Sequence, residues 1–176
     1  MGSGYLTYHG VKKDYSVFKA RVDGSLTEVT AEMLDVITSI GNSAFQYCTS
    51  LASITIPSSV TSIGYHAFDD CDSLTSVTIP SSVTSIGIQA FSGCDSLASV
   101  TIKDGATGIR DYAFYWCEAL QSVTVEAIIP PVIGTGVFSR NHPNSVIYVP
   151  SESVETYKTA TNWSTYASRI QAIPST

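Results

Sequence analysis

Four cysteines are the first residues of this sequence whose side chains could do chemistry. Cys48, Cys71, Cys94 and Cys117 are evenly spaced along the chain. Zinc sites take their ligands in pairs about two to four residues apart, and these cysteines do not have that spacing. We therefore interpret them as buried thiols that serve as small apolar residues. A regular spacing can also stack equivalent residues, so a disulfide between neighbouring cysteines remains an alternative. The cysteines do not indicate a redox compartment.

Carboxylates and imidazoles are the next candidates. Asp69, Asp70 and Asp72 form an acidic cluster, but no DxDxDG calcium loop occurs, so we interpret the cluster as a solvated patch. The histidines are scattered along the chain: His9, His66 and His142. No nucleophile motif, phosphate-binding loop or dinucleotide fingerprint is present. The sequence therefore predicts a protein that is not an enzyme and needs no metal or cofactor.

The elements that must position these residues are copies of one unit. The segment LASITIPSSVTSIGYHAFDDCDS, at 51–73, recurs almost verbatim at 74–96 and in more divergent form at 97–119 and from Leu120, always at the same interval. A repeat of this length indicates a solenoid, in which successive coils stack and share one core. A lone coil buries too few apolar side chains to offset the entropy lost in ordering its backbone, so neighbouring coils must supply the remainder.

Each repeated position has a structural task. The pattern LxxIxI at 51–56 predicts a short strand with its apolar side inward, and Pro57 ends that strand because proline cannot donate a ladder hydrogen bond. The pattern VxxI at 60–63 predicts a second, shorter extended piece. Gly64 then permits a sharp turn or a close backbone approach. The pattern AFxxC at 67–71 predicts one turn of α-helix or 3₁₀ helix.

The residues that differ between units predict a surface of another kind. They fall between the repeated glycine and Ala-Phe, and between Phe and Cys. We interpret them as an aromatic-rich rim that contacts a protein or glycan partner, with drift at solvent positions as the alternative. The rim residues are Tyr47, Tyr65, His66, Asp69, Asp70, Tyr112, Tyr115 and Trp116. The outward strand positions, by contrast, carry small hydroxyl residues such as Ser76 and Thr78, which lack the anchors of an interface and indicate a structural face.

We interpret residues 1–176 as a single domain whose two ends depart from the repeat. Residues 1–25 are expected to be an N-terminal cap or a junction to a larger protein, and 26–150 form the repeats. The first coil, 26–50, has two extra residues around 33–36. Residues 151–176 predict a C-terminal cap helix with Ser151 as its N-cap. Its apolar residues are expected to seal the core: Val154, Tyr157, Ala160, Trp163, Tyr166 and Ile170.

Composition excludes several classes of partner. Residues 1–25 carry a net charge of +2, whereas 26–176 carry 5 basic and 13 acidic residues, a net of −8. An acidic body without basic stripes argues against nucleic acids and anionic membrane surfaces. No apolar run approaches the roughly 20 residues of a spanning helix, so we expect no membrane insertion. No export signal is visible, and the opening MGSG resembles a cloning remnant.

The units at 51–73, 74–96 and 97–119 strongly resemble the BspA-like (Treponema pallidum type) leucine-rich repeat, with the pattern LxxIxIPxxVxxIGxxAFxxC. The segment IYVPSESVETYKTATNWSTY is similar to the C-terminal cap of Bacteroidetes members. The resemblance covers 26–150 and implies an α/β solenoid, with a parallel β-sheet on one side and short strands and helical turns opposite. Departures at Lys103-Asp104, Ala106 and Arg110 bring the regularity of the fourth coil into question.

The resemblance also implies a function. Proteins of this type are extracellular or cell-surface proteins of bacteria that act in adhesion and protein binding, so a protein or glycan partner is expected. The alternative is a structural or receptor-binding component of a phage tail or fibre-like assembly, in which related repeats occur. An adhesin is expected to follow an export signal in its full-length gene, and a tail component is expected to lack one and to trimerise. The oligomeric state stays open between them.

Overall fold

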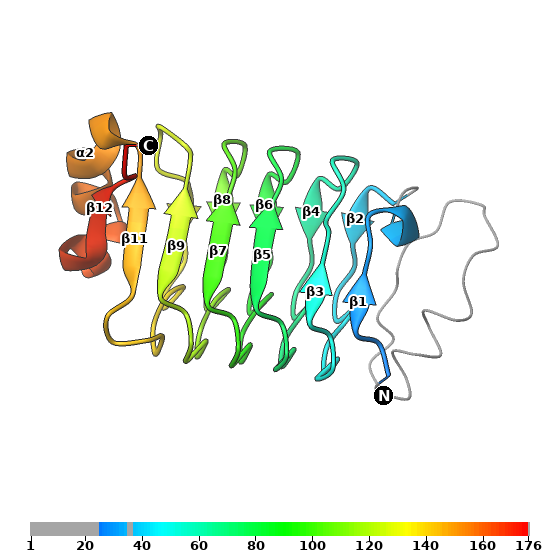
Figure 1. Ribbon diagram of the computed structural model, residues 1–176. Helices are drawn as coiled ribbons and strands as arrows, with labels where there is room; N and C mark the ends of the chain where they lie inside the picture. Colours follow the sequence, from blue (N-terminus) through cyan, green and yellow to red (C-terminus); the bar gives the residue numbers. More distant parts are fainter. Residues whose placement is uncertain (1–24, 35–36, 176) are drawn as a thin grey trace.

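The computed structural model describes residues 25–34 and 37–175. They form a right-to-left stack of coils in Figure 1, in which each coil contributes one strand to a front sheet and one to a back sheet. The proposed N-terminal cap at residues 1–25 lies outside the described residues apart from Ser25.

The front side carries parallel strands in two hydrogen-bonded sheets. The first has two short strands, β1 (Glu28–Val29) and β3 (Ser53–Ile54). The second has five longer strands: β5 (Ser76–Ile79), β7 (Ser99–Ile102), β9 (Ser122–Val125), β11 (Val146–Val149) and β12 (Ile170–Ala172). The hydrogen-bonded register repeats the period of the sequence, since Thr78 pairs with Thr101 and Thr101 with Thr124. Inward positions are buried, and the outward Ser and Thr side chains are exposed or half-buried. The predicted hydroxyl face is therefore confirmed.

The back sheet contains one two-residue strand per coil, also parallel. Its strands are β2 (Ser39–Ile40), β4 (Ser62–Ile63), β6 (Ser85–Ile86), β8 (Gly108–Ile109) and β10 (Val132–Ile133). The isoleucine of each strand is buried and faces the front sheet. After β4 the chain passes very close to the previous coil: a Cβ on Gly64 would lie 2.7 Å from the backbone nitrogen of Asn42. Close approach, rather than a left-handed turn, therefore explains this glycine.

The irregular coils keep the register of their neighbours. In the first coil, Val29 pairs with Ile54 as the alignment predicts, and a 3₁₀ turn, η1 (Glu32–Leu34), replaces the Pro-Ser-Ser turn. The fourth coil is regular despite its departures, because β8 pairs on both sides and the backbone N–H of Arg110 donates to Ile86 at 2.9 Å. In the fifth coil the extra residue widens the loop between β9 and β10, at the upper edge in Figure 1.

The C-terminal segment packs over the last coil and combines short helices with a strand. It contains η2 (Ser151–Ser153), α2 (Val154–Thr159), η3 (Trp163–Arg169) and strand β12. Tyr157, Trp163 and Tyr166 are buried, and the Trp163 Nε1–H donates to the carbonyl of Pro131 at 2.8 Å. The Tyr157 hydroxyl likewise donates to the carbonyl of Ala127 at 2.7 Å. These aromatic residues therefore seal the last coil and satisfy its exposed carbonyl groups.

The prediction that Ser151 is the N-cap is wrong. The α-helix begins at Val154, its N-cap is Ser153, and neither that residue nor Pro150 before η2 makes a side-chain capping hydrogen bond. The Ser151 hydroxyl donates instead to the Glu152 carboxylate at 3.2 Å. The Ser153 hydroxyl donates to the carbonyl of Ile128 at 2.7 Å, so this serine joins the cap to the fifth coil.

Candidate binding rim

The turns that lead from each back strand toward the lower edge in Figure 1 form a third stack of hydrogen-bonded segments. In the turn of the first coil, the backbone N–H groups of Phe45 and Tyr47 donate forward to Ala67 and Asp69 of the next coil, at 2.7 and 2.8 Å. The N–H of Cys48 instead donates within its own turn, to Phe45 at 3.1 Å. Because donors alternate between the two directions, no continuous helix forms. The predicted helical turn is therefore wrong, and the segment consists of successive hydrogen-bonded turns.

This alternation places two residues of each turn in the left-handed region of backbone space. Their φ values lie between 51° and 66°, and most of them are not glycine. They are Ser43, Tyr47, His66, Asp70, Gln89, Gly93, Tyr112, Trp116, Gly136 and Arg140. Left-handed backbone costs an L-residue of this kind about 1 kcal/mol or more. Each of these residues is the second of the two that differ between units at its place in the turn, so half of the variable positions have this unusual backbone conformation.

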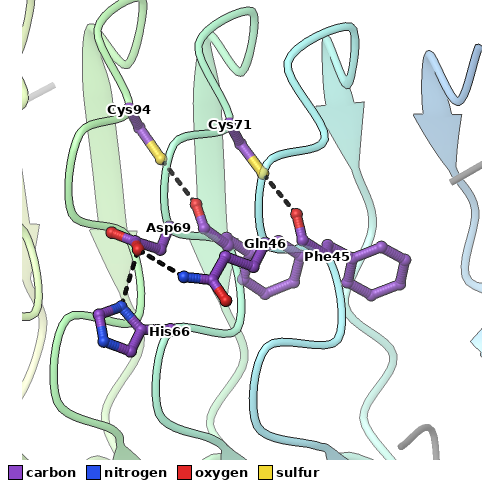
Figure 2. A network of polar contacts seen from close by, with 7 residues as sticks. Phe45, Gln46, His66, Asp69, Cys71 and Cys94 are labelled. Carbon is purple, nitrogen blue, oxygen red and sulfur yellow. Dashed lines mark hydrogen bonds and ion pairs between the residues drawn. The ribbon is translucent and has the colours of Figure 1, made fainter. Parts of the chain in front are cut away.

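The repeated residues of the turns point the other way, into the core. Their phenylalanine rings stack coil upon coil, with centroids 5.2, 4.8, 5.2 and 5.7 Å apart along Phe45, Phe68, Phe91, Phe114 and Phe138. The core also fixes the thiols: Cys71 Sγ donates to the carbonyl of Phe45, and Cys94 Sγ to that of Phe68, each at 3.2 Å (Figure 2).

The four cysteines are buried and none of them forms a disulfide, which confirms their interpretation as apolar core residues over the disulfide alternative. Burial raises the pKa of the Cys94 thiol well above its ordinary value and that of Cys117 to about 12. A thiol of this kind is protonated at neutral pH and is a poor nucleophile.

The structure places four of the predicted rim aromatics in solvent. Tyr47 and Trp116 are 64% and 49% exposed, and Tyr65 and Tyr112 are also exposed. Tyr115 is half-buried between Tyr112 and Trp116, to which it packs edge to face. Sequence reasoning located these side chains by the differences between units, and their outward placement agrees with it.

The largest aromatic group lies on the fourth coil, and we call Tyr112, Tyr115 and Trp116 the aromatic cluster. Ring centroids are 5.4 Å apart for the first pair and 6.0 Å for the second. The Tyr112 ring lies across the next coil at Gly136, where a Cβ would come within 2.6 Å of it. Trp116 Nε1–H donates to the Glu118 carboxylate at 2.8 Å, so its indole is held in one orientation.

Arg140 is a rim residue that the sequence reasoning missed. Its guanidinium carbon lies 5.7 Å from the centre of the Trp116 ring, within the range of a cation–π contact. The available signal was the register of the fifth unit. That unit has one extra residue before Phe138, so Arg140 follows Phe138 as Trp116 follows Phe114 and therefore stacks on Trp116.

The second coil differs from the prediction at Asp69. This carboxylate does not project from the rim, because it is only 7% exposed. It accepts a hydrogen bond from Gln46 Nε2 at 2.9 Å and lies 2.8 Å from His66 Nδ1 (Figure 2). His66 is itself mostly covered, and the Tyr65 ring packs edge to face against it. Asp69 therefore joins two coils; of the other rim residues predicted in this coil, Tyr65 is exposed, and His66 and Asp70 are half-buried.

A second apolar surface, which sequence reasoning also missed, lies at the opposite edge. Ile128 and Ile129 are exposed in the widened loop of the fifth coil, as is Val132 at the start of β10, and Ile129 is 81% exposed. The cap hydrogen bonds to Ala127, Ile128 and Pro131 hold this loop through its carbonyl groups and leave the aliphatic side chains outside.

Neither a metal centre nor a spanning helix occurs in the part of the chain that the structure describes. There, no group of three or more His, Cys, Asp or Glu side chains is placed to hold a metal ion. Within the same residues, no helix has the length and apolar character needed to cross a membrane.

Comparisons with known proteins identify the repeat. The family model of the BspA type leucine-rich repeat region matches residues 17–166 in 6 copies. A T. pallidum leucine-rich repeat protein is 30% identical, with 71% of this chain and 56% of that chain covered and a TM-score of 0.60. A leucine-rich repeat protein from Bacteroides ovatus is 28% identical, with 71% and 39% covered and a TM-score of 0.56.

This chain thus spans little more than half of the T. pallidum protein and less than half of the Bacteroides protein. The comparison with curated proteins found no match. The family model covers most of the chain, and the stacked parallel strands are those of a leucine-rich repeat solenoid. The chain belongs to the BspA-type leucine-rich repeat family.

Proposed function

We propose that this domain is a binding module that recognises a protein or glycan partner through its rim, without catalysis. Leucine-rich repeat proteins generally mediate protein binding, and their fold is typically non-enzymatic. Proteins with BspA-type repeats are commonly found at the cell surface, so the proposal includes adhesion from that location.

The observation that carries the proposal is the conformation of the rim residues. Large side chains such as Tyr47, Tyr112 and Trp116 occupy left-handed positions that glycine would fill at lower cost. Their side chains contribute little to the core, since all three are exposed. Strained backbone that displays aromatic residues is typical of functional surfaces, and Tyr and Trp are the residues that most often anchor protein interfaces.

A double substitution at the aromatic cluster tests the proposal. The variant Tyr115→Ala/Trp116→Ala removes two rings, and the control Ile129→Ala/Val132→Ala removes exposed apolar side chains at the opposite edge. Both are applied with the wild type to an array of glycans and an array of purified extracellular proteins, and thermal unfolding verifies that all three are folded. We expect every specific signal to fall about tenfold or more in the rim variant, as for a hot spot, and to persist in the control. Signals that survive the rim substitutions, or that disappear only in the control, contradict the proposal.

A further inference from the structure

A row of carboxylates runs beside the aromatic cluster. Asp72, Asp95 and Glu118 occupy the same position in three successive coils, each directly after the repeated cysteine, and all three are exposed. Strands of neighbouring coils lie about 4.8 Å apart, so the carboxylates project from one edge at short intervals. We call these three residues the acidic row.

No side chain among the described residues forms an ion pair with the acidic row. The ion pairs found in the described parts of the chain join other residues: His66 to Asp69, Lys103 to Glu126 and Lys158 to Glu155. The pKa of Asp72 is raised by partial burial and then by Asp95, and that of Asp95 by partial burial and then by Glu118. Each member therefore repels the next. Asp70, on the same edge, has its pKa raised by burial and then by Asp69 and the row.

The Trp116 ring, next to the last member of the row, already carries one guanidinium. Arg140 lies against the Trp116 ring, and the Trp116 indole is fixed by its hydrogen bond to Glu118. An aromatic face beside a carboxylate combines a cation–π contact with charge-assisted hydrogen bonding, the chemistry that recognises arginine. Within the described residues, none of the three carboxylates of the row takes part in an ion pair.

We propose that this edge docks an extended, arginine- or lysine-rich segment of a partner protein, with basic side chains on the acidic row and apolar contact on the aromatic cluster. The inference rests on the proposed function and specifies the partner's charge. An acidic glycan fits this edge poorly because it would be repelled by the carboxylates, and a neutral glycan offers them hydroxyl donors but no charge that would relieve the repulsion along the row. A basic polypeptide removes the repulsion along the row and is steered to it by the net negative charge of the coils.

The test uses peptides of defined charge. An alternating Arg-Ser decapeptide and its Glu-Ser counterpart are titrated into the full chain at about 50 mM salt, with calorimetry and the NMR signal of the Trp116 indole as readouts. The variant Asp72→Asn/Asp95→Asn/Glu118→Gln neutralises the row. The control Glu28→Gln/Glu32→Gln/Glu152→Gln neutralises three exposed carboxylates elsewhere, so both variants change the net charge equally.

We expect the Arg-Ser peptide to bind and shift the Trp116 signal, and the row variant to weaken binding about tenfold, as three partly exposed charge pairs would. The control is expected to weaken it less than about twofold, and the Glu-Ser peptide is expected not to bind. Absence of Arg-Ser binding at millimolar concentration, equal weakening in both variants, or equal binding of the two peptides overturns the inference.

The two proposals fail in different ways. If the protein array signals fall in Tyr115→Ala/Trp116→Ala but not in the row variant, the rim is the binding surface and the basic partner is wrong. If neither variant lowers the signals, both proposals are wrong. If both variants lower them, the partner uses aromatic and charged contacts together, as inferred.

Discussion

Phe114 and Trp116 belong to one turn and have opposite surroundings. Phe114 is buried between Phe91 and Phe138, whereas Trp116 is exposed and left-handed. Their backbones nevertheless make the same kind of contact: both N–H groups donate to the next coil, at 3.0 and 3.1 Å. The backbone of the turn is therefore a regular framework in which one set of positions supplies the core. The other set is free to vary, because its side chains do not enter the core.

The reactivity of the buried cysteine thiols tests this contrast most strongly. Burial keeps the thiols of Cys71, Cys94 and Cys117 protonated at neutral pH, with raised pKa values. Reagent reaches them only when the coils open, an event that costs several kcal/mol in a folded domain. We expect iodoacetamide at pH 8 to alkylate the native protein at least about a thousandfold more slowly than the denatured chain, as followed by mass spectrometry. Rapid alkylation without unfolding contradicts the closed stack.

Truncation of a stacked phenylalanine ring is expected to have the next largest effect, a loss of stability. Phe91 is fully buried between two other rings, so Phe91→Ala leaves a cavity and is expected to cost about 3–5 kcal/mol. The matched change Ile88→Ala removes an exposed side chain from the same turn and is expected to cost less than about 1 kcal/mol. Urea denaturation of both variants measures the difference. Equal costs show that the two sets of positions are not distinct.

The core could be predicted from the sequence because the residues that recur in every unit are the buried ones. The stacked Phe, Leu, Ile and Cys residues, the pairing of Val29 with Ile54 and the sealing role of Trp163 all follow from spacing and apolarity. The turn conformation did not follow, since AFxxC fits a helical turn equally well. Only the hydrogen bonds between coils, such as Phe45 N–H to Ala67, select the left-handed alternative.

The outer surface was predicted only in part, for a similar reason. Differences between units located Tyr47, Tyr65 and Trp116, but a variable letter does not say which way its side chain points. Asp69 turned inward because Gln46 of the neighbouring coil offers it a donor. The acidic row was present in the sequence at 72, 95 and 118, but only the structure shows that none of the described residues forms an ion pair with it.

Gly93 tests how firmly the rim backbone is held in its left-handed conformation. Gly93 has φ of 66°, and a Cβ there would lie within hard contact of the Asp70 carboxylate. Gly93→Ala is therefore expected to destabilise the domain by about 1–2 kcal/mol, through left-handed strain and displacement of Asp70. Guanidinium unfolding provides the measurement. A neutral result shows that the rim backbone is soft, not fixed by the hydrogen bonds between coils.

Introducing glycine at a left-handed position is expected to stabilise the domain relative to alanine at the same position. At Tyr47, whose φ is 62°, glycine removes the strain that alanine keeps, so Tyr47→Gly is expected to be more stable than Tyr47→Ala by about 1 kcal/mol. At an ordinary extended position, such as exposed Ser76 of β5, glycine is expected to be the less stable of the two. Thermal unfolding of the four variants gives both differences. The same sign at both positions refutes the assignment of strain.

The smallest expected effect concerns the acidic row. The raised pKa values of Asp72 and Asp95 mean that the folded state holds their protons more tightly than the unfolded chain, so their ionisation destabilises the fold. The two side chains therefore contribute less to the free energy of unfolding at pH 7 than at a pH below their raised pKa values. Asp72→Asn/Asp95→Asn is expected to gain a few tenths of a kcal/mol at pH 7 and low salt, and nothing near pH 3. High salt should reduce the gain, and a loss of stability at pH 7 would contradict mutual repulsion.

The forward-donating turns also make the interior coils interchangeable. A coil such as 74–96 receives hydrogen bonds from the coil before it and donates the same bonds to the coil after it, so a duplicated copy would find every partner it needs. Each inserted coil would increase the distance between the turns on either side of it by about 4.8 Å, without changing the turns themselves. The distance between Tyr65 and Trp116 is thus an adjustable length, set by the number of coils between them. Duplication of internal units can therefore alter the reach of the binding edge while the residues that make contact stay the same.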